Sequence, residues 1–476
     1  MTNWTPHYSA GNNCTAVSVD ASEANPLMRI RKGPLIRSKA TYLGLLSALL
    51  LSGLDVPSAR AREPDGEFDI PARLRLADAL RLFREHGLDL IVAEAAVESA
   101  RGDSLLARAA PNPAFSAGVG RSFACGGLPG CSDLAWSFGV SDQSALFDSL
   151  SGKRGLRTSV ASLAFDAARM GEADAKRTLE GMLRQTYLQS VAARQALTTQ
   201  REAQETLARL ADLIRARYQH GSISEVEVLK IETEKLNVDQ EVERAERDLS
   251  AMKTNLAFML GSRSKVPDFD IDEELPSYQV PQVLQGASVV SLLDLAHKQR
   301  PDLAEARLSR DRAEASVRSS QRLRFPDIEL SAGISGQGAY ASAINPPTLS
   351  FGFTLTPPVF NRYQGEIVKA KADLTTQKAQ FAKTLAQVQS DVQTGFTQFK
   401  SAKSRVERAE RELLEHAKRT RDLVQLQYQK GAASLLEYLD AQRILISTKL
   451  DYQGDLSDYW QSVVLIGQAV GVEIGP

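Results

Sequence analysis

The chain has 476 residues, of which 43% are hydrophobic and only 6% aromatic, and its formal net charge at pH 7 is −1. This length allows a large hydrophobic core in one or two domains. A net charge close to zero gives no support to nucleic-acid binding, so no nucleic acid is expected as a partner.

Residues 1–61 have the pattern of an N-terminal extension followed by a secretory signal peptide. A basic segment over Met28–Lys39 precedes an apolar stretch over Tyr42–Leu54, and Ala59–Ala61 has the form of a cleavage site. The apolar stretch is shorter than the roughly 20 residues of a membrane-spanning helix. Because the residues before Met28 are polar, we expect translation to start there. The mature, exported chain is expected to begin near Arg62, which is not a cysteine and gives no support to N-terminal acylation.

The exported part of the chain keeps two cysteines, Cys125 and Cys131, which enclose Gly-Gly-Leu-Pro-Gly. Disulfides persist in oxidising compartments, so a disulfide that closes this short loop is the expected state. Two free thiols are the alternative, and a metal pair has less support because no histidine lies nearby in the sequence. No metal site and no cofactor are expected.

The exported chain contains one pattern twice. Residues 217–229 read Arg-Tyr-Gln-His-Gly-Ser-Ile-Ser-Glu-Val-Glu-Val-Leu, and residues 427–439 read Gln-Tyr-Gln-Lys-Gly-Ala-Ala-Ser-Leu-Leu-Glu-Tyr-Leu, with matches at an offset of 210. This offset is far longer than the about 20–50 residues of a solenoid unit, so it indicates a duplicated half-molecule. We therefore divide the mature chain into a first repeat over 62–261, a linker over 262–288 and a second repeat over 289–476.

Each repeat is predicted to open with a helical segment, over 72–109 and 289–322, and to continue as a β-hairpin, over 113–147 and 326–357. In all four strands every second residue is mainly apolar, and its neighbours are mostly Ser, Gly, Thr or another small or polar residue. This alternation is typical of strands with one apolar and one polar face. Strands of about 9–11 residues cross a bilayer when tilted.

Four such strands cannot close a barrel, because the smallest known barrels have about eight, and lipid does not tolerate an open sheet edge. The chain is therefore expected to oligomerise and to complete a barrel in a lipid membrane. The competing class is a soluble periplasmic coiled-coil scaffold. A scaffold would explain the helices, but not four strands with small polar residues on one face.

A long helical hairpin is predicted after each pair of strands. Residues 152–217 contain no proline, and residues 361–427 carry apolar side chains at a seven-residue spacing. A sustained seven-residue repeat is typical of supercoiled helices. The two hairpins are expected to turn near residues 221 and 431.

The repeated motif predicts the chemistry of these turns. A glycine fits the left-handed conformation that follows a last helical turn. A serine three residues later caps the next helix, and a glutamate three residues further completes a capping box. A tyrosine before the glycine is expected either to pack the last turn or to hold it by hydrogen bonds. These residues are Tyr218, Gly221 and Ser224 in the first repeat and Tyr428, Gly431 and Ser434 in the second.

Signal peptide, duplicated halves, paired hairpins and a Tyr-x-x-Gly turn resemble the outer membrane efflux protein (TolC) family over nearly the whole mature chain. The most specific matches are Tyr218–Leu229 and the segment from Tyr428 through Asp440-Ala-Gln. Two further segments are similar to the CzcC-like heavy-metal efflux branch of this family. They are Pro357-Pro-Val-Phe-Asn-Arg-Tyr-Gln-Gly-Glu-Ile367 and Gly221-Ser-Ile-Ser-Glu-Val226.

The resemblance implies a mixed α and β membrane protein. Three copies would form a homotrimer with a twelve-stranded outer-membrane β-barrel, continued by a long periplasmic α-helical coiled-coil barrel. The resemblance also implies an exit duct for heavy-metal cations, served by an inner-membrane pump of the resistance-nodulation-division type and a periplasmic adaptor protein. The turns at Gly221 and Gly431 are implied to form the tip that contacts the adaptor. Drug efflux and type I protein secretion are the alternatives, because the same duct serves several pumps.

By the same resemblance, Glu437 and Asp440 match two acidic positions that line the pore constriction, where three copies make rings of negative charge. Glu437 has a second explanation, because the capping box already uses a glutamate there, whereas Asp440 has no capping role. The first repeat carries Lys230 where Asp440 would be, and Ala433 stands where the family's closing network can use an arginine. Any lock at this tip therefore differs from that network.

An enzymatic function has no support in the sequence. The histidines of the mature chain have no metal-ligating His or Cys partner three or four residues on, and neither a Gly-rich phosphate loop nor a nucleophile elbow is present. The histidines concerned are His86, His220, His297 and His416.

Overall fold

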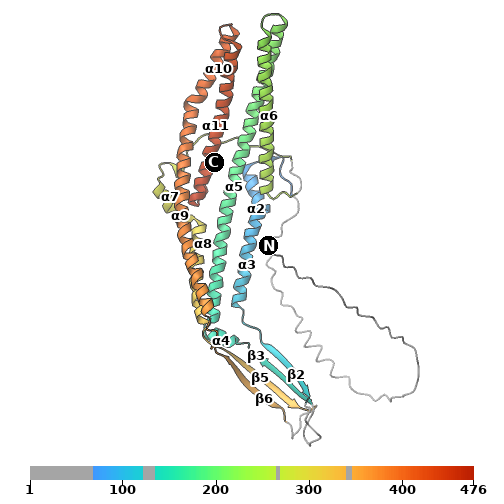
Figure 1. Ribbon diagram of the computed structural model, residues 1–476, viewed down its shortest axis with the longest axis vertical. Helices are drawn as coiled ribbons and strands as arrows, with labels where there is room; N and C mark the ends of the chain where they lie inside the picture. Colours follow the sequence, from blue (N-terminus) through green and yellow to red (C-terminus); the bar gives the residue numbers. More distant parts are fainter. Residues whose placement is uncertain (1–67, 122–133, 264–267, 339–345, 476) are drawn as a thin grey trace, which may run out of the picture. The chain divides into compact units, whose positions relative to one another are not determined.

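The computed structural model describes residues 68–121, 134–263, 268–338 and 346–475. The same order of elements occurs twice (Figure 1): a broken helical segment, two strands, a long helix and a long return helix. The first set is β1 (Arg73–Leu74), α2 (Leu76–His86), α3 (Leu88–Arg108), β2 (Ala114–Arg121), β3 (Leu134–Ser141), α4 (Ala145–Leu150), α5 (Lys153–Gln219) and α6 (Glu225–Met259). The linker holds β4 (Asp270–Ile271) and η1 (Gln282–Leu284). The second set is α7 (Val289–Gln299), α8 (Pro301–Arg322), β5 (Asp327–Gln337), β6 (Thr348–Thr356), α9 (Gln364–Arg408), η2 (Ala409–Leu413), α10 (Leu414–Gln429) and α11 (Leu435–Val470).

Three features divide the helical segments that the sequence predicts over 72–109, 289–322 and 361–427. The first lies at Gly87, where a Cβ would be 2.5 Å from the Phe83 carbonyl oxygen, so only glycine fits between α2 and α3. The second lies at Arg300, because the ring of Pro301 disfavours the helical conformation in the preceding residue. The third is the π-helical turn η2, which divides the long helix predicted over 361–427. The predicted helical segments are present, with these three interruptions.

The four long strands form one antiparallel sheet in the order β2-β3-β5-β6. The contact between β3 and β5 joins the two repeats, and β2 and β6 are the open edges. In their register apolar residues of neighbouring strands lie opposite one another on one face, and small or polar residues do so on the other. This pairing confirms the predicted alternation. The apolar rows include Phe115–Val140–Ala332–Phe351 and Ala117–Phe138–Ile334–Leu349, and the rows on the other face include Ser116–Gly139–Gly333–Ser350 and Gly118–Ser137–Ser335–Thr348.

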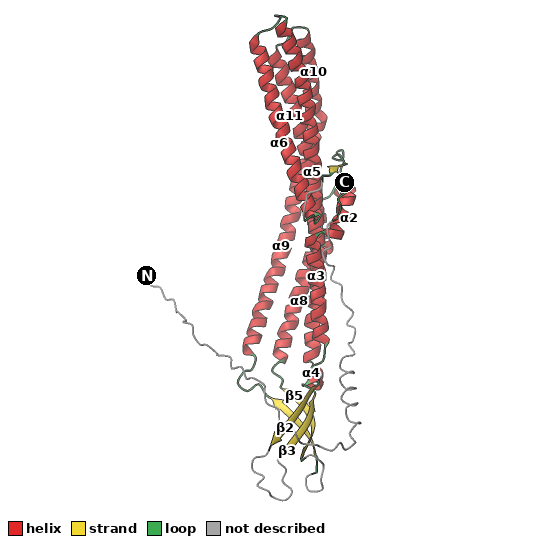
Figure 2. Cartoon of the chain, turned by 90° about the vertical axis from the view of Figure 1, so that its right-hand side faces the viewer, coloured by secondary structure: helices red, strands yellow, loops and turns green. Residues whose placement is uncertain are grey.

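The helices form a row that continues from the sheet (Figure 2). In the half nearer the sheet its order is α3-α5-α8-α9, and in the half nearer the turns it is α6-α5-α11-α10. Helix α5 passes through both halves, which is why it needs 67 residues. None of the helices in the described part of the chain is both long and apolar enough to cross a membrane.

The main hydrophobic core lies where α2, α7, β1, β4 and the linker pack on the row; we call these elements the belt. Aromatic side chains hold the belt in place by hydrogen bonds as well as by packing. Trp460 Nε1 donates to the Pro276 carbonyl oxygen over 2.8 Å, and the Tyr459 hydroxyl donates to the Gln279 carbonyl oxygen over 2.7 Å. Both aromatic residues are on α11 and are fully buried, so the linker is fixed to one face of that helix.

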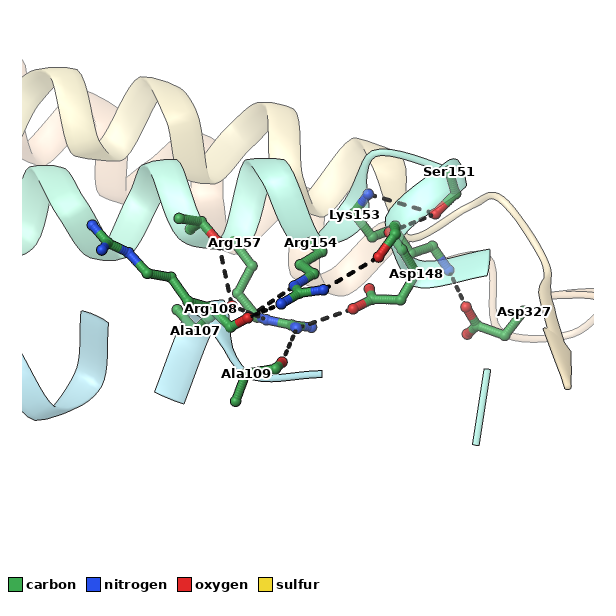
Figure 3. A network of polar contacts seen from close by, with 11 residues as sticks. Ala107, Arg108, Ala109, Asp148, Ser151, Lys153, Arg154, Arg157 and Asp327 are labelled. Carbon is green, nitrogen blue, oxygen red and sulfur yellow. Dashed lines mark hydrogen bonds and ion pairs between the residues drawn. The ribbon is translucent and has the colours of Figure 1, made fainter. Parts of the chain in front are cut away.

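A polar network joins the helical row to the sheet (Figure 3). Arg154 and Arg157 of α5 donate to the last carbonyl oxygens of α3, with Arg154 Nε 2.8 Å from the Arg108 oxygen. Cationic donors at this end satisfy carbonyls that lack a partner within the helix and complement its dipole. Lys153 Nζ also lies 2.7 Å from Asp327 Oδ1 at the start of β5. The strands are therefore attached to the helices at a defined angle.

Candidate functional site: the helical turns and the four-stranded sheet

The apolar face of the sheet is exposed in the single chain. Phe115 and Phe351, on the two edge strands, keep 81% and 79% of their surface exposed. On the other face a Cβ at Gly118 would lie only 2.7 Å from Ser137 Oγ, and one at Gly139 only 2.7 Å from Ser116 Oγ, so glycine stands opposite serine between β2 and β3. The small side chains of this face are those expected on the inner side of a closed sheet, so we take the polar face as the inner one. The outer face is the larger surface, and its extent marks a contact with lipid or protein.

A lysine introduced on the apolar face of the sheet should have a larger effect than one introduced on the polar face. Replacing Phe351 by lysine should reduce the folded protein in the membrane, because a charged residue that faces lipid costs about 2–4 kcal/mol near the bilayer midplane. The matched control is Ser350→Lys, one residue earlier on the polar face, which should be tolerated. The measurement is the fraction of membrane-bound protein whose gel migration changes on heating. Equal losses for both variants would contradict the assignment of the faces.

The two turns between the long helices have the same backbone geometry. Gly221 and Gly431 have φ values of 70° and 76°, in the left-handed region that favours glycine. The Gly221 amide donates to the Tyr218 carbonyl oxygen over 2.8 Å, and the Ser222 amide donates to the Arg217 carbonyl oxygen over 3.0 Å. The equivalent residues of the second turn make the same two hydrogen bonds. These pairs form a Schellman motif, so the predicted role of the two glycines in the turn geometry is confirmed.

The caps that follow the turns differ between the repeats. Ser434 Oγ accepts from the Glu437 amide over 3.3 Å, and Glu437 Oε2 accepts from the Ser434 amide over 2.7 Å, which is the predicted capping box. Hydrogen bonds from the Ser434 amide and hydroxyl lower the pKa of Glu437. Ser224 begins α6 with the same backbone conformation, but its side chain makes no capping hydrogen bond. The predicted capping box in the first repeat is therefore wrong.

This difference predicts unequal effects of one substitution. Ser434→Ala should destabilise the second helical hairpin by about 1 kcal/mol, the usual loss when a serine cap is removed. Ser224→Ala should cost less, because no side-chain cap is lost there. Hydrogen exchange of the amides in the first turn of α6 and α11 gives the two local opening free energies. Equal increases in exchange at both sites would argue against the asymmetry.

The two turn tyrosines also occupy different environments. Tyr428 stacks on Tyr438 with 5.6 Å between ring centroids, and the Arg217 guanidinium lies 5.9 Å from the Tyr428 ring centroid. Burial raises the pKa of Tyr428. Tyr218 remains exposed. Packing of the last turn, one of the two predicted roles, therefore fits Tyr428, and Tyr428 also connects the two hairpins through Arg217.

Asp440 is exposed near the second turn. It precedes Asp458 by 18 residues, about five helical turns, so both lie on one face of α11. The opposite face carries Trp460 and packs on the belt. Glu437 is also exposed, but its carboxylate is occupied by the cap.

Sequence reasoning missed an ion pair beside Asp440. Arg443 of α11 lies 2.7 Å from a Glu234 carboxylate oxygen on α6 and joins the two hairpins. The hydrogen bond and the charge of Glu234 raise the pKa of Arg443, and Asp440 adds to the effect. The two partners are 209 residues apart, so no local pattern could have identified them. Arg443 offsets part of the negative charge at this position.

Two groups of predictions lie outside the described residues. They are the signal peptide with its start at Met28, and the Cys125–Cys131 disulfide; both stay predictions. Within the ranges that the structure describes, no group of three or more His, Cys, Asp or Glu side chains is arranged to hold a metal ion.

A sheet with an apolar outer face and two open edges, joined to two long helical hairpins, is the architecture of an outer-membrane channel with a helical extension. The family model described as outer membrane efflux protein matches residues 79–262 and 292–472, and the chain belongs to this family. The resemblance and the mixed α and β fold predicted from the sequence are thereby confirmed.

Similar proteins include metal-resistance and export proteins. The cobalt-zinc-cadmium resistance protein CzcC of Cupriavidus metallidurans is 22% identical over 404 residues, which cover 84% of this chain and 90% of the relative. The pyoverdine export outer membrane protein OpmQ of Pseudomonas aeruginosa is 26% identical over 291 residues, 60% of this chain and 59% of the relative. The Campylobacter jejuni CmeC outer membrane channel has a similar fold, with a TM-score of 0.71, 16% identity and coverage of 83% and 85%.

Proposed function

We propose that three copies of the chain form an outer-membrane exit duct for heavy-metal cations. In this proposal the duct receives its cargo from an inner-membrane pump of the resistance-nodulation-division type, through a periplasmic adaptor that contacts the turns at Gly221 and Gly431. The observation that carries the proposal is the sheet, whose exposed apolar face and open edges require both lipid and further strands. Three copies of four strands give a barrel within the known size range.

The heavy-metal cargo is supported by the similarity to CzcC, which extends over most of both chains. The similarity to OpmQ supports a second cargo class, an exported siderophore or another small organic molecule. Deleting the gene in its host distinguishes the metal cargo from the organic cargo. Loss of growth in cobalt, zinc or cadmium salts that the intact gene restores is the expected result. Normal growth in these salts, with loss of export of an organic compound, would replace metal by an organic cargo and leave the duct in place.

Within this proposal, Asp440 lines the narrow end of the duct. Three carboxylates held close together attract cations and disfavour anions. Asp440→Ala should therefore lower the cation-over-anion permeability severalfold and weaken block by divalent cations added from the side of the turns. Purified protein in planar bilayers gives both quantities. Unchanged selectivity and block would place the carboxylate outside the pore.

Glu437 requires a different substitution, because alanine would also remove a cap. Glu437→Gln keeps a side-chain oxygen that can accept a hydrogen bond from the Ser434 amide, and it removes only the charge. If Glu437 contributes to the ring, this variant should lower cation selectivity in the same direction as Asp440→Ala. A change in Asp440→Ala alone would assign the ring to Asp440.

A further inference from the structure

Helix α11 has one side that the belt covers and one side that the belt leaves free. Tyr459 and Trp460 lie on the covered side, where they are fully buried and bonded to the linker. On the free side the side chains are exposed or half-buried, and six of them follow one another at spacings of 11, 4, 3, 3 and 7 residues. These spacings keep them on one side of the helix. They are Asp440, Asp451, Asp455, Asp458, Gln461 and Gln468.

The free side faces the passage of the proposed duct, because the belts of three copies would fill the passage if they lay on its inner side. A hollow of about 520 Å³ lies on this free side, between α5, α9 and α11. It is lined mainly by amide and hydroxyl side chains, among them Gln185, Thr397, Ser401 and Gln461. At the level of the belt the wall is therefore polar and carries few charges.

The acidic residues of the free side lie nearer the turns. Asp440, Asp451, Asp455 and Asp458 span 18 residues of α11, about 27 Å along the helix. We call these four residues the acidic stripe. In the described part of the chain, Asp440 and Asp451 form no ion pair, whereas Asp455 and Asp458 both do. The acidic stripe thus has a half without ion pairs toward the turns and a paired half toward the sheet.

The paired half depends on one arginine of α9. Arg405 Nε lies 2.6 Å from Asp455 Oδ1, and Arg405 Nη2 lies 2.8 Å from Asp458 Oδ2. A planar guanidinium has donors in a fixed fork, so one arginine can hold two carboxylates from consecutive helical turns. The three charges sum to −1 instead of −2. All three side chains are partly exposed, so the ion pairs add little to stability.

We infer that Arg405 is a specificity-determining residue of the duct, because it limits the negative charge of the passage to the end near the turns. The inference rests on the proposed function and deepens it. Wall charges attract cations within about one Debye length, which is about 10 Å at 0.1 M salt. Without Arg405 the attraction would continue along the whole acidic stripe to the amide-lined hollow. With Arg405, a cation that enters at Asp440 meets a weaker attraction toward the sheet and is not retained on the wall.

The substitution Arg405→Gln tests this role in an Asp440→Ala background, where the charge nearest the turns is absent. In three copies it changes the summed charge of the paired half from −3 to −6. The cation-over-anion permeability is measured in planar bilayers near 0.01 M salt, where the Debye length is about 30 Å. It should rise at least about twofold over Asp440→Ala alone. Near 1 M salt the Debye length is about 3 Å, and the difference should disappear.

Two variants in the same background separate charge from geometry. Arg405→Lys keeps the positive charge without the fork, and its permeability ratio should stay close to that of Asp440→Ala. Asp455→Asn with Asp458→Asn removes the two carboxylates and leaves Arg405, so the ratio should fall below that of Asp440→Ala. A purely structural role of the ion pairs would give no such opposite changes.

The matched control is Arg201→Gln, which makes the same change of charge elsewhere. Arg201 of α5 is exposed and lies 2.8 Å from Glu246 Oε1 on α6. It follows Gln185 by 16 residues, about 160° around the helix, and so lies on the side away from the hollow. The permeability ratio should not change in this variant.

The inference is wrong if Arg405→Gln forms the heat-sensitive oligomer and its permeability ratio at low salt equals that of Asp440→Ala. An equal rise in Arg201→Gln would also contradict it. If Arg405→Gln does not assemble, Asp455→Asn with Asp458→Asn decides, and an unchanged ratio there overturns the inference. Each of these results leaves a conducting duct in place, whereas a wild-type protein without conductance would remove the proposed function itself.

Discussion

Replacing Gly431 by valine should abolish export while the protein still reaches the outer membrane. A left-handed conformation costs a residue with a Cβ about 1–2 kcal/mol, and a β-branched side chain is a genuine outlier there. The space around Gly431 is open, so the strain comes from the backbone alone and is too small to unfold the chain. It is large enough to change the turn, which is the proposed adaptor contact. The measurements are export or metal resistance, and the heat-sensitive band in outer-membrane fractions.

Two further variants make this test specific. Gly454→Val has the same open surroundings but no positive φ, and it should leave export unchanged. Gly221→Val imposes the same strain on the first turn, where φ is 70°. Normal export in Gly431→Val would reduce the second turn to a connector and remove it from the mechanism.

Replacing Arg300 by methionine should lower the free energy of unfolding by about 3 kcal/mol, because removing one partner of a buried ion pair leaves charge without compensation. Arg300 lies at the corner between α7 and α8 and is buried. Its guanidinium is 2.7 Å from an Asp302 oxygen and 2.9 Å from an Asp391 oxygen, and it donates to the Ala469 carbonyl oxygen over 3.1 Å. It thus joins the belt to α9 and α11. Urea denaturation in detergent, followed by circular dichroism, gives the difference.

The pH dependence identifies the charge as the cause. Burial alone would raise the pKa of Asp302, but the hydrogen bonds and charge of Arg300 outweigh it, and the pKa is lowered from 3.8. A carboxyl whose folded pKa is lowered stabilises the protein above its unfolded pKa and loses that contribution as pH falls through the folded value. The difference between wild type and Arg300→Met should therefore shrink below pH 3.8.

An exposed arginine provides the control. Arg81→Met removes an ion pair with Asp78 on the surface of α2, at 3.1 Å. Such pairs contribute about 0–1 kcal/mol, so little change is expected. A loss as large as that of Arg300→Met would show that the denaturation does not report on the buried network.

Local patterns in the sequence were sufficient to predict the strands and the two turns. The alternation from Phe115 to Val119 and from Leu349 to Leu355 has a period of two, and no other element accommodates it. Gly221 and Gly431 are equally local, because a left-handed residue after a helix is a property of a few neighbouring residues. The need for oligomerisation followed from counting strands. The pore role of Asp440 and the division into 62–261, 262–288 and 289–476 stay predictions.

What the sequence did not predict depends on residues that are distant in the chain. The break at Gly87 arises from close packing over Phe83 within a core that several elements share. Glu234 and Arg443 meet only because two hairpins from different repeats lie side by side. For the first capping motif the sequence predicted too much. Ser224 and Glu227 have the right spacing, yet the Ser224 side chain makes no capping hydrogen bond. A spacing permits such a bond, but the local backbone and the competing partners decide whether it forms.

The π-helical turn at Ala409–Leu413 makes the two hairpins mechanically unequal. Bends in long helices concentrate at π-helical turns of this kind. Helix α5 has no such turn in 67 residues and behaves as an unbroken strut. The corresponding helix of the second repeat consists of α9 and α10 with the π-helical turn between them. The belt packs against α9, on the sheet side of that turn. We therefore expect bending of the second hairpin to concentrate at this turn and bending of the first to be spread along α5.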